Sequence, residues 1–367
     1  MPAGVEKSFA VTQATWRFFA NERVTPQALV EPLRAFAREQ LGQRQLVCIT
    51  PEDGDTTALP YVLAVVDWSK IDYKKHTAKQ DIVQVSNKQD IGYDLTTQLL
   101  VNAQTGQPIA PIQMLMKTAP GTLSTMTSEL QPHEHHLEQV LPLMREADAM
   151  KFHATLIHVI DREADSVFHL RAWNANGFKF LVRGDDDRRV RWRGERTNIR
   201  KIKAQLEVEG AFQQSCNVTI KGKPGVQYVA ETEIILDRPA KRKEDGRSVV
   251  VPGEAITLRL VIAKVVDPVT GVELSVWHLL TNVPSDVPAE TIALWYYWRW
   301  NIESYFKLMK SGGQELEHWQ QESGSAILKR LLVASMACAL VWCLQSNESA
   351  ESVEFQQVLV RLSGKRL

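Results

Sequence analysis

Two largely apolar runs stand out in the first half of the chain, the first of them continuous, and each ends on an aspartate. Residues 61–66 precede Asp67, and residues 155–160 precede Asp161. Short continuous apolar runs are typical of strands that are buried on both faces of a sheet. The pattern therefore predicts two buried strands, each with a carboxylate at its end.

Further strands and helices are predicted around these two runs. Residues 94–116 are expected to form two strands joined by a hairpin turn at 105–108, and a helix is expected through residues 135–144. A second helix over 162–176 should stop at Gly177, and another strand should follow over 178–183. This order of elements predicts an α/β protein with a mixed sheet.

Residues 185–283 break the alternation, because turn-like and charged segments separate β-prone runs and convincing helices are scarce. The β-prone runs cover 227–236, 256–266 and 273–282. We therefore expect an inserted all-β subdomain. Its first stretch, 185–203, holds eight Arg or Lys residues against four acids, together with Trp192. Such a stretch fits an edge that contacts nucleic acid and a solvated loop about equally well.

A long helix is predicted over 286–310, capped by Ser285 or Asp286 and closed by Gly312-Gly313. At about 100° per residue, one stripe of this helix is apolar and should face the core. It contains Trp295, Trp298, Ile302, Tyr305 and Met309. A second, polar stripe lies beside the first and contains Tyr296, Arg299, Glu303 and Lys310.

The polar stripe has two interpretations. A solvated helix face with one Arg–Glu pair is the ordinary one for charges at this spacing. However, this stripe borders the apolar one instead of opposing it, which predicts that Glu303 lies at the rim of a cleft.

The chain divides into five predicted segments. A helical N-terminal segment, 1–58, contains a helix that runs from 25–29 toward Leu41, and residues 59–184 form the first part of the core. The β-strand insertion follows, and the helix within 284–330 completes the core. The C-terminal segment, 331–367, begins with an apolar run that is too short to span a bilayer.

Composition adds little to this picture. The 367 residues are 44% apolar and 23% charged, and the net charge is zero, which argues against a bulk polyanion binder but not against local basic patches. The four cysteines form no C-x-x-C pair, so we expect no structural zinc and a reducing compartment. The start of the chain is no signal peptide. We expect a soluble, cytoplasmic protein that does not bind membranes.

Asp67, Asp161 and Glu303 are candidates for a shared metal site. Carboxylates at buried strand ends need neutralisation, and two Mg²⁺ or Mn²⁺ ions would supply it and activate a nucleophile at a phosphodiester. Arg299 and Lys310 could then hold the remaining phosphate oxygens. The alternative for each aspartate is a plain turn residue.

Three other polar clusters fit structural roles better than chemical ones. The His133-Glu134-His135-His136 segment fits the exposed start of a helix better than a metal site. Residues 185–187, all aspartates, fit a turn, and His158 fits a satisfied core histidine because it lies inside a strand.

The spacing Tyr296-x2-Arg299-x3-Glu303-x6-Lys310 matches the Tyr–Arg–Glu–Lys signature of the insertion-sequence-4 family of DDE transposases. Residues 161–165, which read Asp-Arg-Glu-Ala-Asp, resemble the segment around the second catalytic aspartate of that family. Residues 277–282 and 16–21 resemble the strand before its catalytic helix and its N-terminal opening. The resemblance covers nearly the whole chain.

This resemblance implies a ribonuclease H-like core with a β insertion between Asp161 and Glu303. It implies that Asp67, Asp161 and Glu303 are the catalytic metal ligands. Asp67 matches the family motif only loosely, and Asp55 and Asp72 are nearby alternatives, but Asp67 alone ends a long buried run. The resemblance also implies that Tyr296, Arg299 and Lys310 bind phosphates of the transposon end.

Five more residues are assigned roles at this site. Trp277 resembles a family tryptophan that stacks on a flipped base, and a plain core aromatic is the equal alternative. Lys307 and Arg183 are further DNA-binding candidates. Arg162 and Asp165 are candidates for supporting contacts around the metal ligands.

The resemblance implies a cut-and-paste transposase that acts on double-stranded DNA, with a hairpin intermediate. We expect a homodimer on DNA and a cytoplasmic location, at the nucleoid when DNA is bound. Two alternatives remain. Because the chain looks short at both ends, it could be a DNA-binding regulator that no longer transposes. A host nuclease on the same fold would use the same metals.

Overall fold

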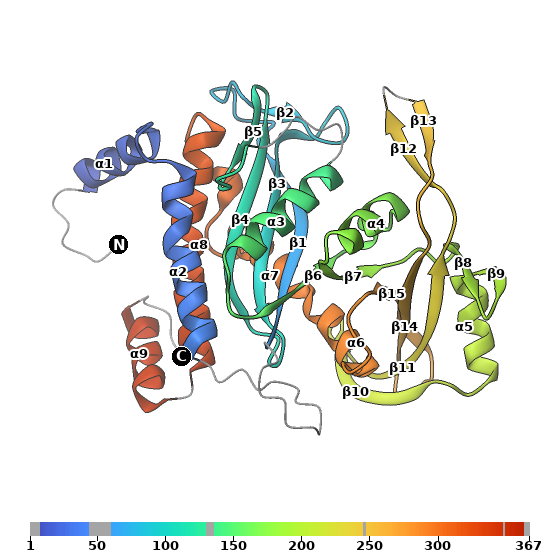
Figure 1. Ribbon diagram of the computed structural model, residues 1–367. Helices are drawn as coiled ribbons and strands as arrows, with labels where there is room; N and C mark the ends of the chain where they lie inside the picture. The colour runs from blue at the N-terminus through green and yellow to red at the C-terminus, as the bar shows by residue number, and fades with distance from the viewer. Residues whose placement is uncertain (1–7, 44–59, 130–135, 245–246, 348, 363–367) are drawn as a thin grey trace.

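The computed structural model describes residues 8–43, 60–129, 136–244, 247–347 and 349–362, which build a large mixed sheet with flanking helices (Figure 1). The sheet has thirteen strands within these residues, and its main path runs β5-β4-β3-β1-β6-β7-β15-β14-β11-β8-β9. The first seven strands are β1 Tyr61–Asp72, β2 Val83–Gln84, β3 Ile91–Asn102, β4 Pro108–Thr118, β5 Gly121–Ser124, β6 Thr155–Ile160 and β7 Lys179–Arg183.

The parallel centre of the sheet lies where the sequence predicts it. Strand β1 pairs parallel to β6 and antiparallel to β3, and β6 pairs parallel to β7. Parallel neighbours need a crossover, which for β6 and β7 is supplied by the 3₁₀ turn η2, Arg162–Ala164, and helix α4, Val167–Ala175. The 3₁₀ turn η1, His136–Gln139, and α3, Val140–Ala149, precede β6. The predicted mixed α/β, ribonuclease H-like fold is confirmed.

Strand β1 is longer than its apolar run indicates. It continues through Asp67 to Asp72, whereas we expected it to end at Asp67. The pairing of β1 with β6 stops at Val66 and Ile160, but its pairing with β3 runs on to Asp72. The apolar run therefore marks the part of β1 that has neighbours on both sides, and Asp67 is the first residue beyond it.

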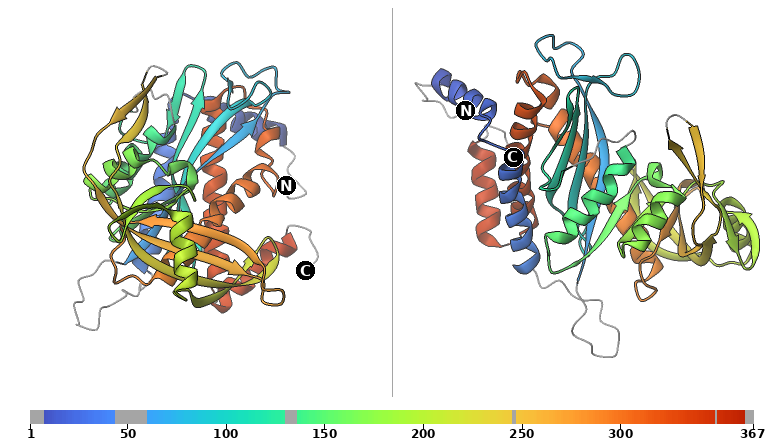
Figure 2. Two further views of the ribbon diagram at one scale, coloured as in Figure 1. Left: turned by 90° about the vertical axis from the view of Figure 1, so that its right-hand side faces the viewer. Right: turned by 45° about the horizontal axis from the view of Figure 1, so that its top comes forward.

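Four helices at the chain ends form a layer on one face of the core sheet (Figures 1 and 2). They are α1 Ser8–Ala20, α2 Pro26–Gln43, α8 Gly324–Ser346 and α9 Ala350–Leu362. Helices α2 and α8 pack on each other and on β4. The buried Arg34 of α2 donates hydrogen bonds to the carbonyls of Ile112 and Thr125. Helix α8 crosses the division that we placed between residues 330 and 331, so that boundary does not separate structural units.

Helix α8 is also longer than the apolar run that predicted it. Its 23 residues make it the one helix in the described part of the chain that is long and apolar enough to cross a membrane. This property carries little weight, because core helices of soluble proteins share it. The packing of α8 against α2 and β4 is that of a core helix.

The strands of 185–283 extend the core sheet. Strand β15 pairs with β7 of the core, and β14 and β11 follow it in order. The strands are β8 Arg189–Trp192, β9 Glu195–Asn198, β10 Gln213–Ile220, β11 Lys223–Leu236, β14 Ile256–Val266 and β15 Glu273–Thr281. Strands β12, Ala240–Glu244, and β13, Arg247–Val251, form a separate two-stranded ribbon.

The insertion is not made of strands alone, which corrects the prediction of an all-β subdomain. Helix α5, Ile199–Val208, lies in the basic stretch that we treated as a loop or edge. The side chain of Asn198 caps it by accepting a hydrogen bond from the amide of Lys201. Ile199, Ile202 and Leu206 are buried at helical spacing. The charges on its other face concealed this pattern.

The predicted helix over 286–310 is two helices that meet at Arg299. Helix α6 runs over Ala289–Trp298 with Pro288 at its N-cap, three positions later than expected, and α7 runs over Trp300–Lys310. The 3₁₀ turn η3, Leu316–His318, follows. The apolar stripe is buried as predicted, apart from the half-buried Trp298.

Candidate active site

The junction of α6 and α7 positions the predicted polar stripe. The amide of Arg299 donates to the carbonyl of Tyr296, and the amide of Ile302 donates to that of Arg299, both at 3.1 Å. These bonds span three residues, so the chain tightens locally without leaving the helical path. As a result, Tyr296 and Arg299 point inward, with exposed fractions of 2% and 5%.

Arg299 bridges two of the three predicted carboxylates. Its Nη1 lies 2.8 Å from Oδ2 of Asp67, and its Nη2 lies 2.7 Å from Oε1 of Glu303. Asp67 and Arg299 are 232 positions apart in the chain, so this pair ties the junction of α6 and α7 to the central strand β1. A buried guanidinium must be paired, and Arg299 therefore fixes both acids in place.

Burial raises the pKa of Asp67 to about 6, although Arg299 and the amide of Trp68 counteract that rise. The Trp68 amide donates to Oδ1 of Asp67 at 2.8 Å. The charges of Asp161 and Glu303 raise the pKa of Asp67 further. Asp67 therefore lies close enough to feel the charges of both other acids.

Asp161 has a different environment from Asp67. Its Oδ1 accepts hydrogen bonds from the Arg162 amide at 2.6 Å and from the Tyr296 hydroxyl at 3.1 Å. Burial raises its pKa, but the charge of Arg299 and these two hydrogen bonds outweigh burial and leave the pKa below its ordinary value. Asp161 also caps the turn η2, so it has the predicted turn role and a place in the site.

The Tyr296 hydroxyl is a hydrogen-bond donor in this site. Burial is the main reason that its pKa is raised, and the negative charge of Asp161 adds to the effect. The phenol therefore stays protonated at neutral pH. It connects the stripe on α6 to the end of β6.

The three acids have the chemistry of a magnesium site but not the arrangement of one. Carboxylate oxygens are the ligands that Mg²⁺ and Mn²⁺ prefer. The described residues contain no group of three or more His, Cys, Asp or Glu side chains that could hold a metal. The guanidinium of Arg299 contacts both Asp67 and Glu303. These carboxylates could therefore share an ion only after Arg299 has moved.

Lys310, the fourth residue of the stripe, does not join the carboxylates. Its ammonium donates to the carbonyl of Lys70 and lies 3.7 Å from Glu317. It therefore ties the end of α7 to β1, three residues beyond Asp67. Lys307 is exposed one turn earlier.

Two basic residues flank Asp161. Arg183, at the end of β7, is half-buried, and its charge helps to lower the pKa of Asp161. Arg162 bonds Asp161 through its backbone amide, while the residue itself is exposed. Both lie beside Asp161, and the DNA-binding and supporting roles assigned to them stay predictions.

Asp165 makes its contacts toward the insertion. Its Oδ1 lies 2.9 Å from Arg188, and its Oδ2 accepts a hydrogen bond from the amide of Asp185. Burial raises its pKa, and Arg188 counteracts that rise. Asp165 therefore links the segment after Asp161 to the start of the insertion, and no described contact of its side chain reaches the three acids.

Trp277 is a core residue in this structure. It is 4% exposed, and its ring packs against the rings of Tyr296 at 5.8 Å and Tyr297 at 6.4 Å. Stacking on a DNA base would require Trp277 to leave these contacts.

The other sequence candidates are placed as follows. His158 is buried, and burial lowers its pKa to about 3, as expected of a core histidine. The side chain of Asp185 accepts the amide of Asp187, which confirms the turn. Asp72 is exposed at the end of β1 and bonds the amide of Lys74. Asp55 lies outside the described residues.

Two aromatic side chains beside Asp67 were not singled out as site residues. Trp68, the next residue on β1, stacks on His136 with ring centroids 4.4 Å apart. Nε2 of His136 lies 3.0 Å from Glu163 in the segment after Asp161. We assigned His136 to the exposed start of a helix, and residues 130–135 before it lie outside the described part. Only the fold brings His136 to Trp68.

A mixed sheet with acids on its central strands and on a following helix is the arrangement of a ribonuclease H-like core. A family model described as the transposase DDE domain matches residues 58–342 of this chain. The match covers well over half of the 367 residues. The chain belongs to this transposase family, whose members act on DNA and generally use divalent metal ions.

Proposed function

We propose that this protein is a cut-and-paste transposase of the insertion-sequence-4 type, with Asp67, Asp161 and Glu303 as its catalytic carboxylates. One pair of observations carries the proposal: Arg299 bonds Asp67 of β1 and Glu303 of α7, and Tyr296, in the same polar stripe, bonds Asp161 just after β6. Separate strands and a helix supply the acids, which is how a ribonuclease H-like site is built.

The proposed reaction needs one cofactor and a defined set of side chains. Two Mg²⁺ or Mn²⁺ ions, held by the three acids, would supply Lewis-acid stabilisation and an activated nucleophile. When DNA binds, Arg299 gives up its contacts with the carboxylates and contacts a DNA phosphate instead. Its two Nη groups can bind that phosphate in a bidentate way. Tyr296 keeps its proton and orients Asp161. Lys310, Lys307 and Arg183 add positive charge along the DNA path.

The bonds change in four steps. Water attacks the phosphorus at the element's end, and the bond from phosphorus to the 3′ oxygen breaks, which leaves a 3′-hydroxyl. That hydroxyl then attacks the opposite strand, so a new phosphodiester closes the hairpin while the flanking DNA leaves. A second water reopens the hairpin, and the freed 3′-hydroxyl attacks target DNA.

The test is cleavage of the element's end by purified protein with magnesium. Glu303→Gln should lower the rate of cleavage by a factor of at least about 10² and should leave the affinity for DNA unchanged. Glu290→Gln is the matched control, because Glu290 is exposed on α6 of the same helical pair. The proposal fails if the wild-type protein does not cut, or if Glu303→Gln cuts as well as Glu290→Gln.

A homodimer on DNA is part of the proposal, since cutting two ends requires two active sites. Helix α9 supports it with three exposed apolar side chains, Phe355, Val358 and Leu359, which lie within about 100° of one another around the helix. Exposed apolar clusters of this kind favour protein contacts. Light scattering with and without the element's end would measure the stoichiometry.

A further inference from the structure

The backbone pairing of the two central strands ends one residue before each proposed catalytic aspartate. Val66 and Ile160 are the last residues that pair β1 with β6. Asp67 stays in register with Thr97 of β3, whereas Asp161 follows the end of β6 and caps the turn η2. The ladder between β1 and β6 therefore does not fix the spacing of Asp67 and Asp161 directly.

A histidine of η1 joins the two segments that carry these aspartates. The ring of His136 stacks on the ring of Trp68, the residue after Asp67, with centroids 4.4 Å apart and planes inclined by 28°. Nε2 of His136 lies 3.0 Å from Oε2 of Glu163, two residues after Asp161. We call these two contacts the His136 bridge.

The His136 bridge lies on the face of β1 that does not carry the Asp67 carboxylate. Successive side chains of a strand point to opposite faces of its sheet. Trp68 accordingly packs with the hydrophobic cluster that contains Leu137 of η1, whereas Ile302 of α7 belongs to the other main cluster. The bridge thus joins the aspartate segments without using α6 or α7.

Stacking on His136 orients the Trp68 ring. The indole Nε1 of Trp68 is buried and has no hydrogen-bond partner among the described residues. The ring is therefore held by packing, which includes the stack on His136. The backbone amide of Trp68 donates to Oδ1 of Asp67 at 2.8 Å. A change in the seating of Trp68 would reach the Asp67 carboxylate through this amide.

Neighbouring contacts hold η1 in place. Gln139 accepts a hydrogen bond from the hydroxyl of Thr96 on β3 at 3.3 Å. Oε1 of Glu138 lies 3.6 Å from Nε2 of His169 on α4. The turn η1 is thus tied to the sheet and to α4, so His136 has a firm support from which to hold both ends of the bridge.

The bridge gains importance when DNA arrives. In the proposed reaction, Arg299 leaves Asp67 and Glu303 for a phosphate, so the α6–α7 pair releases Asp67 when that acid must act. The contacts of His136 contain no atom of α6 or α7 and can persist through this change. Spacing matters at that moment, because a displacement of about 1 Å between reacting groups can lower a rate about 100-fold.

We propose that His136 is a positioning residue that keeps Asp67 and Asp161 at their working distance while Arg299 contacts DNA. It acts through Trp68 and Glu163 and not on the reacting atoms. The proposal rests on the proposed function, because it requires both aspartates to take part in one reaction.

Hydrogen exchange tests the bridge in the free protein. The amide of Ala164 is protected by its bond to the carbonyl of Asp161 at 3.0 Å. His136→Ala should speed exchange of this amide at least about fivefold, because exchange follows local opening and the turn η2 has lost its contact with η1. Mass spectrometry of the peptide that covers residues 161–166 measures the change.

Two further variants control this measurement. Leu141→Ala is the matched control for lost stability, because Leu141 is half-buried against the same cluster as Trp68 but lies on α3. It should change the exchange of 161–166 less than about twofold. Glu163→Gln decides the question if His136→Ala does not fold. The Glu163 side chain is 63% exposed, and its loss should speed the same exchange about 1.5- to 5-fold, the range of one exposed ion pair.

Cleavage of the element's end separates a positioning role from a structural one. His136→Ala should lower the single-turnover rate at saturating DNA about 10- to 100-fold, the range for residues that support the ligands of a site. Its affinity for DNA should change less than about twofold, and Leu141→Ala should keep the wild-type rate. His136→Phe, which keeps an aromatic face for Trp68, should recover part of the rate.

Two results overturn the positioning role. One is exchange of 161–166 at the wild-type rate in His136→Ala, or in Glu163→Gln where that variant decides. The other is cleavage by His136→Ala at the rate of Leu141→Ala. If the wild type does not cut the element's end, the proposed function fails instead. Faster exchange in His136→Ala would then still support the bridge, and unchanged exchange would overturn it as well.

Discussion

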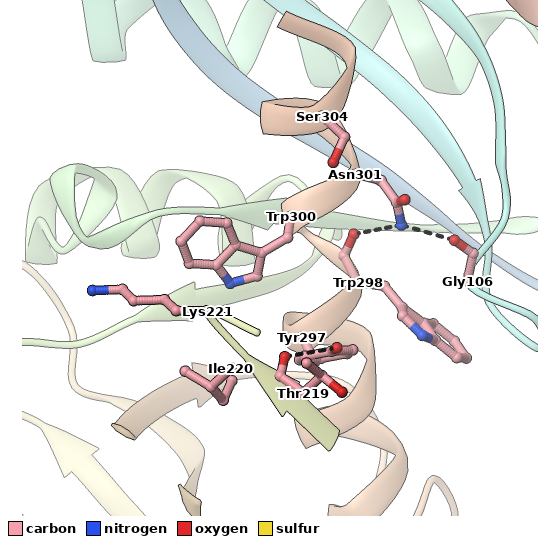
Figure 3. Close-up of a pocket in the computed structure, with 9 residues that line it drawn as sticks. All are labelled: Gly106, Thr219, Ile220, Lys221, Tyr297, Trp298, Trp300, Asn301 and Ser304. Atoms are coloured by element: carbon pink, nitrogen blue, oxygen red, sulfur yellow. Dashed lines mark hydrogen bonds between the residues drawn. The ribbon is translucent and has the colours of Figure 1, made fainter. Parts of the chain in front are cut away.

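Two neighbouring faces of the α6–α7 pair meet opposite requirements. On the carboxylate-binding face, Arg299 is buried, and both of its Nη atoms bond carboxylates. On the neighbouring pocket face, Tyr297, Lys221 and the 44% exposed Trp300 line a pocket of about 390 Å³ (Figure 3). The first face is saturated by contacts within the chain, while the second retains surface for a ligand.

The difference follows from what each side chain costs when buried. A guanidinium inside a protein must be paired, so Arg299 draws acids from β1 and α7 around it. An indole can stay partly in water at little cost. One residue step along a helix turns the chain by about 100°, so two adjacent residues can serve stability and ligand binding separately.

The largest expected effect compares these adjacent residues directly. Arg299→Ala should destabilise the protein by about 3–5 kcal/mol, because removing one partner of a buried ion pair leaves uncompensated charge. Trp300→Ala should cost about 1 kcal/mol or less, as expected at a partly exposed site. Urea unfolding at pH 7 measures both.

Arg299→Lys is the control for that comparison. It keeps the charge but cannot contact two carboxylates as a planar fork does, so its stability should fall between wild type and Arg299→Ala. Equal losses for Arg299→Ala and Trp300→Ala would show that the two faces do not differ as described.

A smaller effect comes from the pH dependence of stability on the carboxylate-binding face. The pKa of Asp67 is raised by burial to about 6 in the folded state, from an ordinary value of 3.8. The folded protein therefore holds this proton more tightly than the unfolded chain. The stabilisation is complete below about pH 4 and is lost as pH rises through about 6, by at most about 3 kcal/mol.

Asp67→Asn isolates this contribution because asparagine does not titrate. The difference in unfolding free energy between the variant and wild type should change across pH 4–6 and stay constant above pH 7. A difference that is flat throughout pH 4–8 would contradict the raised pKa of Asp67.

The sequence predicted the positions of the acids better than their contacts. Asp161 follows a run of mainly apolar residues that predicts a buried strand. Glu303 lies on a helix stripe that the 3.6-residue repeat predicts. Both are local signals. The bridge from Arg299 to Asp67 spans 232 positions, and no periodicity reports a contact at that separation.

Other differences have the same origin. Helix α5 was missed because its basic face suggested a loop, although its three apolar residues have helical spacing. The burial of Trp277 depends on two tyrosines that come from another element. Trp68 and His136 meet only because β1 and η1 are neighbours in the fold. Composition and pattern cannot report tertiary neighbours of this kind.

The smallest expected effect concerns the cation of the pocket face. Lys221→Asn removes one charge at a position with φ of +50°, and asparagine tolerates that backbone conformation. One phosphate contact fewer should reduce the slope of log affinity against log salt by about 1 for duplex DNA that carries the element's end. Lys151→Asn is a close control, because Lys151 is exposed and has φ of +49° but lies outside the pocket. If both variants lower the slope equally, the effect belongs to general surface charge, and Lys221 has no particular role in the pocket.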